Sequence, residues 1–168
     1  MQRLAVLTTL LFAATAAAQP PALSQHPRVG ELCEIDFPAG SARILAPGAT
    51  AELGEVAGWA KDNPDGLIVL DGFADRGSEG TPPERVRLSM QRAAAVRDEL
   101  VSAGVDRDRI VVAGFGGDSG QRASAAQNRR VTVWVTHEDL DAVVARLDAT
   151  GAFAIVWGNQ QIPALATR

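Results

Sequence analysis

The stretch GFADRGSEGTPPERVRLSMQRAAAV, residues 72–96, contains the features from which the fold can be predicted. It opens with a Gly-rich loop and continues with a helical pattern. Thr81 fits the N-cap, Pro82 the first turn and Glu84 the far end of a capping box, so a helix is expected to begin here. Residues three or four positions apart are expected to form its buried face: Ser89, Ala93, Val96 and Leu100.

Two arginines lie on one flank of this predicted helix. Arg85 and Arg92 are seven positions apart, with Leu88 between them. A guanidinium at the edge of a core needs acceptors, and Asp75 in the preceding loop is the candidate. Two interpretations stay open. Asp75 and Arg92 form a structural ion pair, or Asp75 binds the ammonium group and Arg92 the carboxylate of one zwitterionic ligand.

The flanking sequence alternates between strand and helix patterns. Residues 67–70 form a continuous apolar run, which predicts a central strand buried on both faces. The other segments are strands at 31–37, 109–115 and 130–135, and a helix at 49–60 that precedes the central strand. Crossovers through helices imply parallel pairings. The sequence therefore predicts an α/β sandwich with the strand and helix order βαβαββ, in which helices pack on one face of a mixed sheet.

A C-terminal extension follows the last of these strands. Thr136 is expected to cap a helix whose apolar residues are Leu140, Val143, Val144 and Leu147, and Gly151 to end it. A short strand is predicted at 153–157. The predicted organisation is a signal peptide (1–18), a Pro-rich linker (19–28), the main domain (29–136), the helix–strand extension (137–157) and a loose tail (158–168).

The first 18 residues resemble a secretory signal peptide. Arg3 precedes an apolar run too short to span a bilayer, and Ala16-Ala17-Ala18 offers a cleavage pattern. An N-terminal membrane anchor is the alternative. No cysteine stands at the cleavage point for lipid attachment, and no transmembrane segment is expected in the mature chain. Cys33 is the single cysteine, so it is expected to be a buried strand thiol or to form an intermolecular disulfide.

Composition and the distribution of reactive residues exclude several functions. The net charge is −4, which argues against binding to nucleic acid or to an anionic membrane. The two histidines, His26 and His137, lie in the linker and beyond the last core strand. No Ser/His/Asp arrangement and no metal-ligand cluster is visible, so no catalytic residue, metal or cofactor is predicted.

Four motifs in order carry a family resemblance. They occupy Gly72–Asp75, Leu88–Ala93, Gly114–Gly116 and Asn128–Val131. Together with the strand and helix pattern they resemble the OmpA-like peptidoglycan-binding domain, over roughly residues 31–135. The loop sequence is most similar to the peptidoglycan-associated lipoprotein branch, although this chain lacks the lipid-bearing cysteine.

The resemblance implies a ligand and its site. Asp75 would hold the side-chain ammonium of diaminopimelate in the peptidoglycan stem peptide, and Arg92 a carboxylate. Leu88 and Ser89 would position the start of the helix. The residues expected to border the site from the last strand are Asn128 and either Arg129 or Arg130, and hydrogen bonding at the sheet edge is an equal alternative for them.

Two departures from the family pattern concern this site. Arg85 stands where the family has Asn, so it would add a carboxylate contact or compete for Asp75. The loop after Asp75 is longer by about two residues. The expected function is non-covalent peptidoglycan binding in the periplasm of a Gram-negative bacterium, with an outer-membrane or other envelope protein as a further candidate partner. The alternative is a periplasmic protein-interaction module on the same fold that has lost the ligand.

Overall fold

The computed structural model describes residues 29–45 and 47–161. The expected signal peptide and Pro-rich linker lie outside the described residues, as does most of the expected tail. Within the described ranges, no helix has the length and apolar character needed to cross a membrane.

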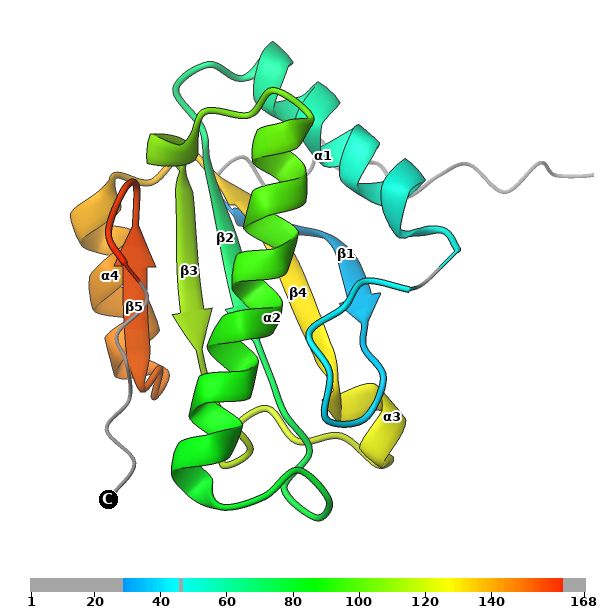
Figure 1. Cartoon of the computed structure of the whole chain (residues 1–168). Helices are drawn as coiled ribbons and strands as arrows, with labels where there is room; N and C mark the ends of the chain where they lie inside the picture. Colours follow the sequence, from blue (N-terminus) through cyan, green and yellow to red (C-terminus); the bar gives the residue numbers. More distant parts are fainter. Residues whose placement is uncertain (1–28, 46, 162–168) are drawn as a thin grey trace, which may run out of the picture.

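Five strands form one mixed sheet in the order β1-β4-β2-β3-β5 (Figure 1). β2 and β3 are parallel, whereas β1–β4, β2–β4 and β3–β5 are antiparallel. The parallel pairing predicted across the helix after β2 is therefore confirmed, whereas the one predicted between the first two strands does not form, because β4 lies between β1 and β2. The elements are β1 (Val29–Asp36), α1 (Ala49–Asp62), β2 (Leu67–Gly72), α2 (Pro82–Ser102), a 3-10 helix (Arg107–Arg109), β3 (Ile110–Gly114), α3 (Ala125–Asn128), β4 (Arg130–Thr136), α4 (Leu140–Ala149) and β5 (Ala154–Trp157).

Helices cover both faces of this sheet. α1 and α2 pack on one face, over a core that includes Leu70 and Val96, and α4 packs on the other, over a core that includes Val69 and Leu147. Figure 1 shows α4 behind β5, on the side of the sheet away from α2. The expectation that the helices of the βαβαββ core pack on one face is therefore confirmed by α1 and α2, and α4, for which no face was predicted, covers the other. Two covered faces explain the apolar run of β2, because side chains of alternating residues point to opposite helical layers.

The end of β2 is held tightly against α2. A Cβ atom built on Gly72 would lie 2.1 Å from the backbone oxygen of Ser89, so only glycine allows this approach. The Glu84 carboxylate accepts hydrogen bonds from the Thr81 backbone N–H at 2.7 Å and from its hydroxyl at 2.8 Å, which confirms the predicted helix start. These two features fix the loop between β2 and α2 at one end of the sheet.

The extension contains the expected helix and strand, but its helix begins differently. Asp139, not Thr136, caps α4, and its carboxylate accepts a hydrogen bond from the Ala142 backbone N–H. Thr136 is the last residue of β4, and its hydroxyl accepts from the Glu138 backbone N–H at 3.0 Å. Two residues between the strand and the cap allow the chain to turn before α4 begins. β5 then pairs with β3 at the edge of the sheet.

Cys33 lies half-buried on β1 as a free thiol. Burial, reinforced by the negative charge of Glu52, raises its pKa to about 12. The thiol therefore stays protonated at physiological pH, and a protonated thiol is a poor nucleophile.

Candidate functional site

Asp75 lies in the loop that connects β2 to α2, where its side chain is buried. Its carboxylate accepts a hydrogen bond from the Ser78 hydroxyl at 2.6 Å and another from the Asn128 side-chain amide at 3.0 Å. These hydrogen bonds, the one from Ser78 first, lower the pKa of Asp75 below its ordinary value. Asp75 is therefore a fixed negative charge at this end of the sheet.

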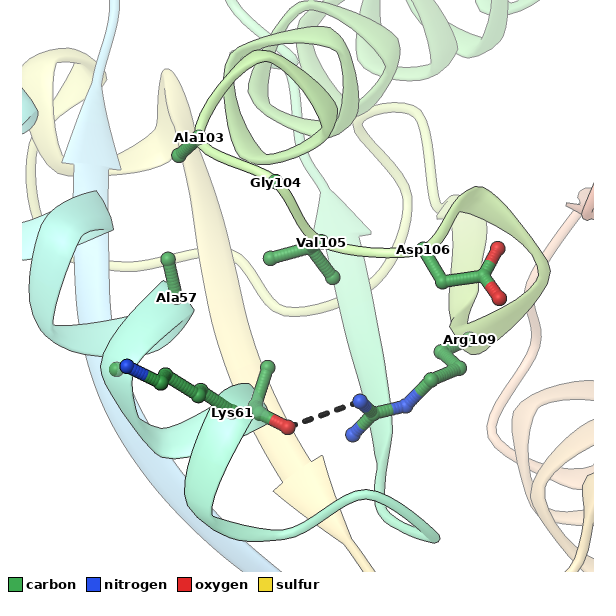
Figure 2. Close-up of a pocket in the computed structure, with 9 residues that line it drawn as sticks. Ala57, Lys61, Ala103, Gly104, Val105, Asp106 and Arg109 are labelled. Carbon is green, nitrogen blue, oxygen red and sulfur yellow. Dashed lines mark hydrogen bonds between the residues drawn. The ribbon is translucent and has the colours of Figure 1, made fainter.

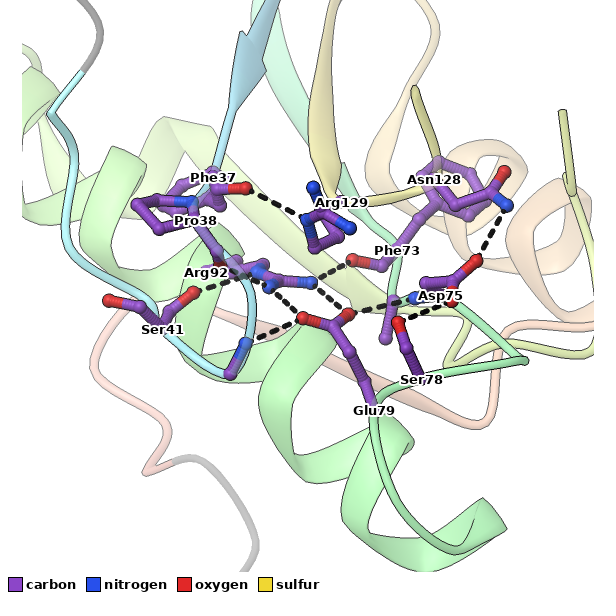
Figure 3. A network of polar contacts seen from close by, with 12 residues as sticks. Phe37, Pro38, Ser41, Phe73, Asp75, Ser78, Glu79, Arg92, Asn128 and Arg129 are labelled. Atoms are coloured by element: carbon purple, nitrogen blue, oxygen red, sulfur yellow. Dashed lines mark hydrogen bonds and ion pairs between the residues drawn. The ribbon is translucent and has the colours of Figure 1, made fainter. Parts of the chain in front are cut away.

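Arg92 is fully buried on α2, and the hydrogen-bonding capacity of its guanidinium is used completely. Two donors bind the two oxygens of Glu79, at 2.6 and 2.8 Å, which forms a bidentate ion pair. The other three bind backbone carbonyl oxygens at 2.9–3.0 Å, those of Pro38, Ser41 and Phe73. The arginine thus connects α2 to the loop after β1 and to the end of β2 (Figure 3).

The partner of Arg92 is Glu79, so the interpretation of a direct ion pair between Asp75 and Arg92 is wrong. The two residues are linked indirectly, because Glu79 also accepts a hydrogen bond from the Asp75 backbone N–H at 2.8 Å. The sequence motifs did not single out Glu79, since it lies in the loop that departs from the family pattern. The one available signal was an acid within a loop of turn residues, between Gly77 and Gly80.

Arg85 does not reach Asp75. Its guanidinium donates to the Gly80 carbonyl oxygen at 2.6 Å and pairs with the Asp118 carboxylate at 3.3 Å. Arg85 is buried and binds the loop after β3 to the beginning of α2. It therefore neither competes for Asp75 nor adds a cation beside it.

The two arginines that follow Asn128 point in different directions. Arg129 is half-buried, and its Nε donates to the Phe37 carbonyl oxygen at 3.3 Å. Its two terminal nitrogens have no partner among the described residues. The Arg92 guanidinium lies 5.5 Å from the ring centre of the same Phe37, so Arg129 borders the Arg92 cluster (Figure 3).

Arg130 is directed elsewhere. It forms an ion pair with Glu34 at 3.2 Å and lies 4.0 Å from the ring centre of Phe73. Its terminal nitrogens donate to the carbonyl oxygens of Gln127 and Gly120. Of the two arginines predicted to border the site, only Arg129 retains donors near Asp75 and Arg92.

Ser89 connects α2 to a neighbouring loop. The Ser89 hydroxyl donates to the Val86 carbonyl oxygen at 2.8 Å and accepts from the Gly116 backbone N–H at 3.0 Å. This fully buried hydroxyl joins α2 to the loop after β3. Leu88 is half-buried one position before it.

A separate pocket of about 390 Å³ lies at the opposite end of the strands, between the C-terminal ends of α1 and α2 (Figure 2). Arg109 borders it, and its guanidinium donates to the carbonyl oxygens of Ala60, Asn63 and Gly66. Its charge therefore caps the end of α1 and the turn after it. Lys61 and Asp106 also line this pocket, but none of the residues of the four family motifs does.

The fold and the site together define a class of protein: an α/β domain that carries a charged cluster on the loops at one end of a mixed sheet. The chain belongs to the OmpA family, whose family model matches residues 36–133. The match runs from the end of β1 into β4, so α4 and β5 lie beyond it.

Two relatives and one solved structure illustrate the similarity. The chain is 37% identical over 97 residues to the peptidoglycan-binding protein ArfA of Mycobacterium tuberculosis, covering 54% of this chain and 29% of ArfA. It is 35% identical over 103 residues to the peptidoglycan-associated lipoprotein of Brucella melitensis, covering 61% of this chain and 60% of that protein. The chain thus spans less than two thirds of either relative.

The solved structure is the peptidoglycan-associated lipoprotein from Burkholderia pseudomallei. It shares 27% sequence identity with this chain, with a TM-score of 0.55, and the match covers 61% of this chain and 89% of that structure. This agreement supports the mixed sheet and helices described above.

Proposed function

We propose that this domain binds peptidoglycan non-covalently by recognising the diaminopimelate of the stem peptide. One observation carries the proposal: an ionised acid, Asp75, lies in the same cluster as two arginines, Arg92 and Arg129. Diaminopimelate bears both an ammonium group and carboxylates. A site with fixed charges of both signs can therefore bind both charged groups at the end of its side chain.

The relatives support this proposal by their names, since one is called a peptidoglycan-binding protein and another a peptidoglycan-associated lipoprotein. These names describe binding and not catalysis, and we infer the same for this chain, without a cofactor. By the same reasoning we propose a location in the periplasm, in association with the outer membrane. An envelope protein is a further proposed partner.

Each residue has a distinct proposed role. Asp75 accepts the ligand ammonium in place of the Ser78 hydroxyl, while Asn128 continues to hold its carboxylate. Arg129 donates its terminal nitrogens to a carboxylate. Arg92 donates to a carboxylate when Glu79 is released. Asn128, Leu88 and Ser89 hold these groups in place, whereas Arg85 and Arg130 hold the neighbouring loops.

Co-sedimentation of the purified protein with diaminopimelate-type sacculi tests this function. We expect Asp75→Asn and Arg129→Ala each to weaken retention about tenfold, since each removes a charged hydrogen bond to the ligand. Sacculi that carry lysine in place of diaminopimelate lack one carboxylate and should retain the protein less. Asp148→Asn and Arg107→Ala are matched controls, because both residues lie outside the cluster. Equal retention of all four variants would refute the site.

The same fold has a second candidate function, as an envelope protein-interaction module without a carbohydrate or peptide ligand. The ion pair of Arg92 with Glu79 favours it, because this pair leaves the arginine without a free donor. Failure of the folded wild-type protein to sediment with any sacculi would select this function.

A further inference from the structure

Glu79 occupies a site that has the composition of a carboxylate receptor. Arg92 donates to its two oxygens at 2.6 and 2.8 Å, and the backbone N–H groups of Asp75 and Gly40 each donate at 2.8 Å. The four donors come from α2, from the loop after β2 and from the loop after β1 (Figure 3). A guanidinium fork combined with backbone N–H groups is a geometry that binds a carboxylate specifically.

The environment keeps the Glu79 carboxylate charged. Burial of this side chain opposes its ionisation, but the hydrogen bonds from Arg92, Asp75 and Gly40 outweigh the burial and lower its pKa. The side chain is 1% exposed. The receptor is therefore formed completely in this structure, and its occupant is a side chain of the same protein.

Ser78, the residue before Glu79, contacts the acid of the cluster, Asp75. The Ser78 hydroxyl donates to the Asp75 carboxylate at 2.6 Å. Two successive residues thus supply a donor to Asp75 and a carboxylate to Arg92, which are the two interactions that a zwitterionic ligand would make.

The segment that carries these residues can leave without dismantling the core. Residues 76–78 and Gly80 are exposed, and Glu79 is the one buried side chain between them. Gly80 adopts a φ of +82°, which favours glycine, and Gly77 precedes Ser78. Rotation at these glycines would move Ser78 and Glu79 together into solvent.

We propose that the Ser78–Glu79 segment is an internal competitor that sets the affinity of this site for carboxylate ligands. An external carboxylate binds Arg92 only when Glu79 is displaced, and the same movement removes Ser78 from Asp75. Residue 79 thereby determines how strongly the site binds, and Arg92 remains paired before and after the exchange. The identity of the natural ligand rests on the proposed function, whereas the carboxylate receptor does not.

The test uses acetate as the probe and Glu79→Ala as the variant that empties the receptor. Thermal unfolding is measured at pH 7 in increasing acetate, with chloride at equal ionic strength as the reference. A ligand that binds only the folded state raises the unfolding temperature. We expect acetate to stabilise Glu79→Ala in a saturable way, and about tenfold more acetate to be needed for the same shift in the wild type. Glu99→Ala is the matched control, since Glu99 is an exposed acid near the far end of α2, and it should behave as wild type.

A second variant keeps the test decisive if Glu79→Ala does not fold without acetate. Glu79→Gln fills the same volume without the charge, so an external carboxylate should displace it more readily than it displaces Glu79. Refolding of Glu79→Ala by acetate, or tighter acetate binding by Glu79→Gln than by the wild type, supports the proposal. Absence of an acetate-specific effect in both variants overturns it.

Retention on sacculi separates this inference from the proposed function. Acetate binding by the variants without retention on sacculi would preserve the internal competitor and reject peptidoglycan as the ligand. Retention of the wild type with no acetate effect in either variant, and no gain of retention in Glu79→Gln, would preserve the function and reject the competitor.

Discussion

Two buried acid–arginine clusters lie on opposite sides of the sheet, and they differ in how completely their polar atoms are paired. On the α2 side, every donor of Arg92 has an acceptor, and Glu79 accepts four hydrogen bonds. On the α4 side, Asp71 Oδ1, Trp134 Nε1 and Arg146 Nη2 are buried without a hydrogen-bond partner among the described residues. The Trp134 indole lies beside the Asp71 carboxyl.

The pKa values of the two acids, Asp71 and Glu79, therefore shift in opposite directions. Burial raises the pKa of Asp71 to about 7, because the positive charge of Arg146, the neighbouring Trp134 indole N–H and the positive charge of Arg130 oppose it only in part. The pKa of Glu79 is lowered, although burial acts on it in the same sense as on Asp71. Direct hydrogen bonds from charged and backbone donors, and not the mere proximity of an arginine, decide whether a buried acid stays ionised.

The largest expected effect comes from Arg92→Met, which breaks the paired cluster. The substitution leaves the Glu79 carboxylate and three carbonyl oxygens buried without their donor. We expect a loss of about 3–5 kcal/mol in the free energy of unfolding, measured by urea denaturation at pH 7. The double variant Glu79→Gln/Arg92→Met should lose less than the sum of the single losses. A loss below about 1 kcal/mol for Arg92→Met would show that the ion pair is not a structural element.

Asp71→Asn tests the unpaired cluster through its pH dependence. The folded-state pKa of about 7 exceeds the ordinary 3.8, so the folded chain holds a proton there that the unfolded chain has lost. Stability should therefore fall as the pH rises from about 4 to 7, by about 2 kcal/mol between pH 5 and 7. Asparagine removes this contribution, and denaturation curves at the two pH values should differ less. The lowered pKa values of Glu79 and Asp75 act at more acidic pH, where their protonation removes stability. An unchanged pH dependence in Asp71→Asn would contradict the assignment.

Asn128→Ala probes the Asp75 side of the paired cluster. It removes the donor to the Asp75 carboxylate and the acceptor of the Arg122 backbone N–H. We expect a loss of about 1–2 kcal/mol in stability and a rise in the pKa of Asp75 toward its ordinary value. Carboxyl NMR titration measures the second effect. Asp75 titrating as in the wild type would mean that Ser78 alone holds it ionised.

The smallest effect is expected for Arg146→Gln. The guanidinium pairs with Glu138 at 3.5 Å, and its side chain is 33% exposed, so the pair should contribute at most about 1 kcal/mol. Loss of its positive charge should nevertheless raise the pKa of Asp71 further and move the stability change to higher pH. A large loss of stability at pH 5 would show that the two clusters are more similar than their pairing indicates.

Several features were predictable because they depend on local sequence. The start of α2 followed from Thr81 and Glu84, which interact within one turn. The central position of β2 followed from its continuous apolar run, since a strand between two helical layers has no exposed face. The order of the family motifs also placed Asp75 and Arg92 at one end of the sheet.

The partners of the charged residues depended on tertiary structure. Arg92 could be placed at the edge of the core from its spacing, but its acceptors come from loops up to 54 positions away in sequence. Arg92 pairs with Glu79 and not with Asp75, because the loop after β2 folds back and directs the Glu79 side chain toward Arg92. Similarly, α4 packs on the second apolar face of β2, and Asp71 on β2 is buried.

The sequence by itself determined the strand and helix order, the family and the placement of Asp75 and Arg92 at the charged end of the domain, since these follow from short-range patterns. Only the tertiary structure decided that Arg92 is bound to Glu79, that Arg129 and not Arg130 borders the Arg92 cluster, and that Arg85 binds Asp118. The physical reason is that a long charged side chain can reach several acceptors, and the choice between them depends on distances set by packing elsewhere in the chain.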